Sequence, residues 1–173
     1  MIKLTAEELK EKIEKHRKWL ENADGGERLA VAYDLRGANL DCANLRGANL
    51  IGANLDCAKN IPYVPVACPT HGEFIAWKKV KQKIVKLKIL EDAKRCSATG
   101  RKCRCDKALV LAIENTDGSD SGLSEILNEN YAGCLYKVGE MVYPDSFDDN
   151  RWNECSHGIH FFVDRGEAKR WQA

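Results

Sequence analysis

Residues 33–58 read YDLRG ANLDC ANLRG ANLIG ANLDC A, and this stretch decides how the first part of the chain folds. Its period is five residues without a gap, which matches neither the 3.6-residue period of an α-helix nor the two-residue period of a β-strand. A strict five-residue period requires a solenoid in which equivalent positions stack from coil to coil. Its leucines are therefore expected to point inward: Leu35, Leu40, Leu45, Leu50 and Leu55.

The other repeat positions suit a tight coil. Small alanines stand beside the leucines, Asn or Asp before each leucine can satisfy the turn backbone, and Gly or Cys at the fifth position fits a corner. These units resemble the pentapeptide-repeat family, whose A-(N/D)-L-x-x unit builds one square face per repeat. The resemblance implies about one coil of a right-handed quadrilateral β-helix, which must be capped by neighbours because it cannot bury its own ends.

An amphipathic helix is predicted before the repeat. Thr5 and Glu8 form a capping box at its start, and Gly25-Gly26 is expected to stop it. Apolar or weakly polar residues recur at helical spacing between these signals: Leu9, Ile13, His16 and Leu20. This helix is the expected cap of the coil.

A change of pattern follows the repeat, because residues 59–66 (KNIPYVPV) hold two prolines and no period. We therefore expect an N-terminal helix and cap (1–32), a repeat coil (33–60) and a C-terminal domain (61–173). Apolar runs predict strands in that domain at 74–77, 83–90, 107–113, 135–142 and 158–163, and a closing helix at 165–171. The predicted fold class is α+β with a mainly antiparallel sheet and a short β-helix.

The C-terminal part also resembles an uncharacterised domain family that often follows a few pentapeptide repeats in bacterial and phage proteins. The resemblance covers residues 68–170 and implies no established activity. It rests on the segments FIAWK (74–78), EDAKR (91–95), TGRKCR (99–104), YKVG (136–139), PDSF (144–147) and ECSHGIHFF (154–162).

A basic constellation between two predicted strands is the main candidate site. Residues 94–104 hold five cations, two hydroxyls and one glycine, and arginine forks match phosphate or carboxylate. The alternative is a solvated turn whose cations meet Glu91, Asp92 and Asp106. The expected ligand-binding residues are Arg95, Ser97, Thr99, Arg101, Arg104 and His160.

A second constellation surrounds Cys155, His157 and His160, where adjacent residues rarely supply the geometry of a nucleophile and its base. We predict no catalytic residue there, and His160 is expected to be a buried, hydrogen-bonded histidine. Three short Cys/His clips raise the question of zinc, but they lack paired C-x-x-C knuckles, so we expect no metal and no cofactor. The clips are Cys68/His71, Cys103/Cys105 and Cys155/His157.

The charge balance limits the partners. The 27 Lys and Arg nearly cancel the 26 Asp and Glu, so the whole molecule offers no steering field for a polyanion. One coil of mixed charge imitates neither the shape nor the field of a DNA duplex. The chain shows neither an apolar leader nor a run of 18 apolar residues, from which we expect a cytoplasmic protein that does not enter a membrane.

The function favoured by these patterns is a non-catalytic binding or adaptor protein that holds an anionic ligand, such as a nucleotide, or a host protein. The phage occurrence of the family suggests a role in conflict between phage and host. One alternative is a small enzyme acting on a phosphorylated or nucleotide substrate, with Arg95, Arg101 and Arg104 on the phosphate and Glu154 or His160 as acid or base. Another is a structural component of a larger assembly.

Overall fold

The computed structural model describes residues 2–30, 33–50, 53–55, 57–129, 133–153 and 155–171 of the 173-residue chain. The chain divides into two units. The first holds residues 1–66 with 98–100 and 150–155, and the second holds 67–97, 101–149 and 156–173. Among the described residues, no helix is both long enough and apolar enough to cross a membrane.

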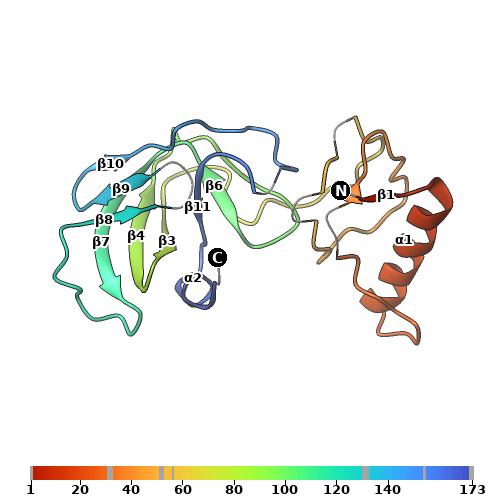
Figure 1. The fold of residues 1–173 in the computed structure, drawn as a ribbon, viewed down its shortest axis with the longest axis horizontal. Helices are drawn as coiled ribbons and strands as arrows, with labels where there is room; N and C mark the ends of the chain where they lie inside the picture. Colours follow the sequence, from red (N-terminus) through yellow and green to blue (C-terminus); the bar gives the residue numbers. More distant parts are fainter. Residues whose placement is uncertain are drawn as a thin grey trace. The chain divides into compact units, whose positions relative to one another are not determined.

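Helix α1 (Ala6–Leu20) opens the first unit (Figure 1). The capping box is confirmed: Thr5 Oγ1 accepts from the Glu8 amide at 3.2 Å, and Glu8 Oε2 accepts from the Thr5 amide at 2.8 Å. The helix ends at Leu20, before the Gly25-Gly26 pair that was expected to stop it. Gly26 is needed for the return of the chain, because a Cβ there would lie 2.5 Å from the backbone nitrogen of Trp19.

The repeat packs with α1 in one hydrophobic core. Each of its five leucines exposes 3% or less of its surface, and Leu9 of the helix and Leu29 lie in the same cluster. Parallel bridges join Asp34 to Asn54 and Asn39 to Lys59, and each bridge spans twenty positions, or four repeats. Residues 51, 52 and 56 of the predicted repeats lie outside the described residues.

The fifth position of several repeats has a left-handed backbone. Gly37 and Gly47 have φ of +69° and +70°, and Cys42 and Cys57 have φ of +59° and +55°. The fifth position is therefore limited in backbone conformation as well as in size. A parallel pair of two-residue strands, β1 (Ile2–Lys3) and β2 (Tyr33–Asp34), joins the start of the chain to the start of the repeat.

The second unit is built on antiparallel sheets, as predicted. A four-stranded sheet has the order β10-β7-β4-β3 and a three-stranded sheet the order β11-β6-β5. The two sheets are linked by the antiparallel bridge between Trp77 and Phe162, with both N···O distances 2.8 Å. The strands are β3 (Phe74–Val80), β4 (Lys83–Ile89), β5 (Arg95–Ser97), β6 (Cys103–Cys105), β7 (Ala108–Asn115), β10 (Met141–Val142) and β11 (Ile159–Phe161).

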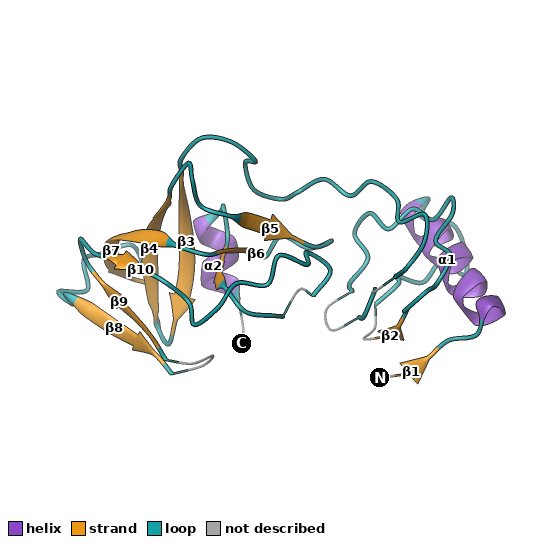
Figure 2. Cartoon of the chain, turned by 90° about the horizontal axis from the view of Figure 1, so that it is seen from above, coloured by secondary structure: helices purple, strands orange, loops and turns teal. Residues whose placement is uncertain are grey.

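A separate hairpin of β8 (Glu125–Asn128) and β9 (Cys134–Lys137) lies beside β10 (Figure 2). Predicted strand 135–142 is thus two strands, β9 and β10, because Gly139 with φ of +83° turns the chain between them. Helix α2 (Arg165–Arg170) packs beside β3 (Figure 1).

Cross-strand partners share a face of a sheet, so the register defines two faces in this unit. We call inner the face that carries Phe74, Ala76 and Val80 of β3, and outer the face that carries Trp77 and Phe162. The rings of Phe74 and Phe161 meet on the inner face, with centroids 5.9 Å apart. On the outer face Phe162 meets Trp171, just after α2, at 5.4 Å.

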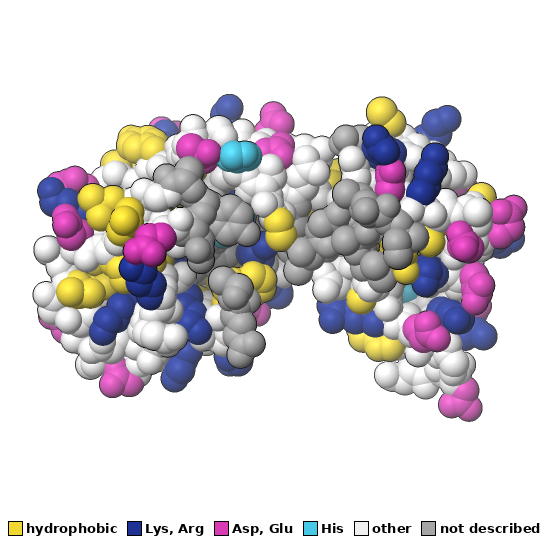
Figure 3. All heavy atoms as spheres, in the orientation of Figure 1, with side chains coloured by type: hydrophobic (Ala, Val, Ile, Leu, Met, Phe, Trp, Pro, Cys, Tyr) yellow, Lys and Arg dark blue, Asp and Glu magenta, His cyan; other side chains and the backbone are white. Residues whose placement is uncertain are grey.

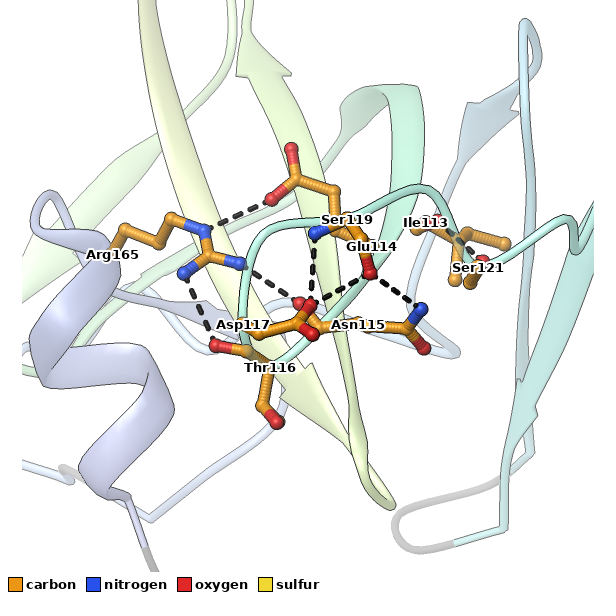
Figure 4. A network of polar contacts seen from close by, with 8 residues as sticks. All are labelled: Ile113, Glu114, Asn115, Thr116, Asp117, Ser119, Ser121 and Arg165. Atoms are coloured by element: carbon orange, nitrogen blue, oxygen red, sulfur yellow. Dashed lines mark hydrogen bonds and ion pairs between the residues drawn. The ribbon is translucent and has the colours of Figure 1, made fainter.

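A polar network fixes the loop after β7 (Figure 4). Arg165 of α2 donates to Glu114 Oε2 at 2.9 Å and to the carbonyl oxygens of Asn115 and Thr116. Within the loop, Asp117 Oδ1 accepts from the amide and the hydroxyl of Ser119. These contacts connect α2 to the end of β7, so the polar residues of this loop stabilise the fold.

Candidate functional site

Arg95 is a structural clamp. Its guanidinium donates to five backbone carbonyl oxygens over 2.7–3.3 Å, and Arg95 also lies over the Phe74 ring at 5.4 Å. The acceptors are Pro69, Gly72, Leu90, Glu91 and Ala93. An arginine has five N–H donors, so this set occupies them all and leaves none for an anion.

The predicted basic loop is in fact a hairpin of β5 and β6, and its register separates the arginines. Arg95 pairs with Cys105, while Arg104 pairs with Cys96, so the two guanidinium groups leave the sheet on opposite faces. The expectation that Arg95, Arg101 and Arg104 converge on one anion is therefore corrected. Sequence alone did not give the register that separates them.

The remaining loop candidates also have local partners. Arg101 is largely exposed and donates from Nε to Glu167 Oε1 at 2.9 Å. Ser97 is buried, and its hydroxyl accepts from the Ala67 amide at 2.8 Å. Thr99 lies in residues 98–100, which belong to the first unit, so the structure does not group it with the other candidates.

Two of the predicted residues do meet on the outer face. Arg104 of β6 and His160 of β11 are direct cross-strand partners. Arg104 is 2% exposed although it is an arginine, and its neighbour Lys102 is 7% exposed. Lys102 Nζ lies 5.1 Å from the centre of the Trp171 ring, which gives this cluster an aromatic wall. We call Lys102, Arg104, His160 and Trp171 the outer-face cluster.

The charge state of His160 follows from its surroundings. Burial lowers the pKa of His160 to about 3, and the positive charges of Lys102, Lys78 and Arg104 act in the same direction. The imidazole is therefore neutral at pH 7. A neutral imidazole has one donor and one acceptor, and a backbone hydrogen bond with Ser156 involves the ring of His160.

Gly158 allows this cluster to form. Its φ is +137°, and a Cβ there would lie 3.1 Å from Arg104 Cβ and 3.3 Å from the Cys105 carbonyl oxygen. A side chain at this position would push β11 away from β6. Glycine is thus required for the close approach of the two strands that hold Arg104 and His160.

A residue that the sequence reading passed over lies on the inner face. Lys78 follows the alternation of Ala76 and Val80, so its side chain leaves β3 on the face of the core. Its Nζ donates to the His160 carbonyl oxygen at 3.2 Å and lies 6.0 Å from the centre of the Tyr136 ring. The sequence did hold a signal for this residue, because Lys78 alternates with the apolar Ala76 and Val80 and so belongs to the buried side of the strand.

The thiols of Cys103 and Cys105 are buried and protonated. A hydrogen bond with Cys68 and burial raise the pKa of the Cys103 thiol, and burial raises the pKa of Cys105. Metal ligation requires the thiolate. In the part of the chain that the structure describes, no group of three or more His, Cys, Asp or Glu side chains is arranged to hold a metal ion.

The second constellation is dispersed. His157 is exposed and pairs with Asp145, with 2.9 Å between Nδ1 and Oδ2. Cys155 is exposed and belongs to the first unit, and Glu154 lies outside the described residues. Acidic and basic side chains are interspersed over the visible surface of both units (Figure 3).

Comparison with protein families agrees with the two-part organisation. Pentapeptide repeats match residues 34–59, and a family of unknown function, DUF5758, matches residues 64–168. No curated protein and no solved structure matches the chain. The second match spans more than half of the sequence and contains every residue of the outer-face cluster except Trp171, so the chain belongs to the DUF5758 family, here preceded by pentapeptide repeats.

Proposed function

We propose that this protein is a binding module for an anionic ligand and that the outer-face cluster holds the ligand. The observation that carries the proposal is the burial of Lys102 and Arg104 on the same face as a neutral His160. A bound anion would be attracted by both positive charges, and burial strengthens that attraction because less water screens it.

The chemistry of the cluster favours phosphate or carboxylate groups. Arg104 offers a planar fork and Lys102 a point charge. The Trp171 ring beside Lys102 adds an aromatic surface on which a nucleobase can stack. Nucleotides are therefore the first ligands to test among anions.

Binding fits this cluster better than acid–base catalysis by His160. A general acid or base works best when its pKa lies near the working pH, and the pKa of His160 is about 3. At pH 7 the imidazole has no proton to give beyond its single N–H and is a weak base. This argues against the alternative in which His160 acts on a phosphorylated substrate.

We further propose that the repeat forms about one coil of a right-handed quadrilateral β-helix, with α1 as its cap. Support comes from the bridges between residues four repeats apart and from the left-handed backbone at the fifth position. The coil would serve as a platform for the second unit or as a surface for a protein partner.

Ligand binding is testable by thermal unfolding and calorimetry with phosphate, citrate and mono-, di- and cyclic nucleotides. A ligand that binds only the native state stabilises it by about 2.7 kcal/mol at one hundred times its Kd. We expect at least one anion to raise the melting temperature, with an effect that weakens as salt increases. The variants Lys102→Gln and Arg104→Gln should abolish the response.

The matched control is Lys137→Gln, which removes an exposed lysine of β9 and should leave the response intact. Arg101→Gln should also leave it intact, because Arg101 pairs with Glu167 outside the cluster. If no anion shifts unfolding, or if the control and cluster variants lose the response equally, the outer-face cluster is a structural feature and the proposal fails.

A further inference from the structure

Lys78 is a lysine in the core face of a sheet. It follows Ala76 and precedes Val80 on the inner side of β3, and its cross-strand partner is the buried Val85 of β4. Tyr136, at 1% exposure, covers it from β9. Taken as a whole residue, Lys78 is half-buried.

The groups around the Lys78 amine are thiols, a phenol and cations. Cys134 of β9 and Cys105 of β6 act on it electrostatically, as does Lys102 from the segment before β6. In the described part of the chain, no carboxylate belongs to this set. Its hydrogen bond goes to the His160 carbonyl oxygen, which needs one N–H only.

These surroundings disfavour the ammonium form. Burial lowers the pKa of Lys78 to about 8, and the charge of Lys102 lowers it as well. A neutral amine can still donate to the His160 carbonyl and keeps its lone pair. Desolvated lysines beside another cation are the usual nucleophiles that form imines with carbonyl compounds.

We propose that Lys78 is a reactive amine that captures aldehydes or ketones as imines, at a site on the inner face distinct from the outer-face cluster. The Nζ lone pair attacks the carbonyl carbon and forms a carbinolamine after a proton moves from nitrogen to oxygen. Loss of that hydroxyl as water gives the C=N bond. No oxidant or reductant is required, and water reverses the reaction.

The experiment uses the full chain with two probes, pyridoxal 5′-phosphate and the uncharged aldehyde butanal. Each is incubated with protein and trapped by sodium borohydride, which reduces an imine to a stable secondary amine. Peptide mass spectrometry then locates the adduct. At pH 7.5 an amine of pKa about 8 is roughly 200-fold more often neutral than an ordinary lysine, so we expect labelling at least about tenfold faster at Lys78 than at exposed Lys137.

Lys78→Met should remove this adduct, and Lys137→Met should not. Methionine suits the apolar inner face, and Lys78→Arg gives a second variant that keeps the cation but forms no imine. The labelling rate should level off above about pH 8, while that of surface lysines continues to rise.

Slow labelling of Lys78, equal labelling of all lysines, or labelling that requires denaturant would overturn the proposal. Arg104→Gln separates this site from the proposed anion site, because it should abolish anion binding and leave the butanal adduct in place. A failure of anion binding with a butanal adduct on Lys78 would therefore refute only the proposed function, and the reverse result would refute only this inference.

Discussion

Replacing His16 by alanine tests how the N-terminal helix holds the repeat. The His16 ring is 1% exposed and makes two hydrogen bonds to different segments of the first unit. Its Nδ1 accepts from the Leu29 amide at 3.1 Å, so Nε2 carries the proton and donates to the Arg46 carbonyl oxygen at 3.2 Å. One neutral tautomer therefore links α1 to both segments.

The expected loss is large because the buried Leu29 amide and the part-buried Arg46 carbonyl oxygen would both lose their partner. Each unsatisfied group costs about 1–3 kcal/mol, which gives about 2–6 kcal/mol for His16→Ala before any cavity term. Such a loss is a large part of the stability of a small domain. The matched control is Lys10→Ala on the exposed side of the same helix, which should change stability by less than about 0.5 kcal/mol.

The same site predicts a dependence on pH. Burial lowers the pKa of His16, whereas an unfolded histidine titrates near 6.5. Below pH 6.5 the unfolded chain therefore binds more protons than the native state. The free energy of unfolding decreases as the pH is lowered from 6.5 to the pKa of His16 in the folded state. The contribution of His16 is at most about 1.4 kcal/mol per pH unit.

Hydrogen exchange of peptides from residues 26–50, read by mass spectrometry at several pH values, isolates this contribution. The pKa of His160 is lowered too, so the difference between the parent and His16→Ala is the quantity to follow. Faster exchange in His16→Ala, with a weaker pH dependence than the parent, is the expected result. Exchange as slow as in the parent and Lys10→Ala would refute the bridging role of His16.

Three further predictions concern stability. Leu45→Asp should cost several kcal/mol, because it buries a carboxylate among stacked leucines, whereas Arg46→Ala at the next, exposed position should cost less than about 0.5 kcal/mol in chemical unfolding. Arg95→Lys should lower the melting temperature although it keeps the charge, because lysine cannot replace five N–H donors; exposed Arg101→Lys is its control, and equal effects would contradict the clamp. Gly158→Ala should destabilise the second unit by about 1 kcal/mol or more through strain at positive φ, and an unchanged unfolding midpoint would contradict the close approach to β6.

The repeat and the helix were predictable because their signals are local and periodic. Five leucines at a fixed spacing specify which side chains are buried, and Thr5 with Glu8 specifies the helix start. The left-handed backbone at Cys42 and Cys57 was not anticipated, because a small residue indicates space but not backbone conformation. Here the five-residue pattern defined which side chains are buried but not the dihedral angles.

The candidate site was less predictable because it depends on strand register. The basic run 94–104 gives no sign of which cations share a face, and the hairpin of β5 and β6 sends Arg95 and Arg104 to opposite sides. Lys102 and Trp171 meet although they are 69 positions apart in sequence, which no local pattern encodes. The burial of Lys78 could have been predicted, because it alternates along β3 with residues that face the core.

The short strand β6 connects the two proposed sites. Cys103 and Cys105 point to the inner face and Arg104 to the outer face, so a slip of one residue would exchange thiols for the guanidinium. A three-residue strand makes few ladder hydrogen bonds, and its register needs other support. Gly158 lets β11 approach β6 closely at Arg104, which supports one register of this pair. Arg95 holds β5 through its hydrogen bonds to the carbonyl oxygens of Pro69 and Glu91. Arg95 and Gly158 therefore act by fixing the register of β6 and not by binding a ligand. Changes to either residue should alter both the anion response and the reactivity of Lys78.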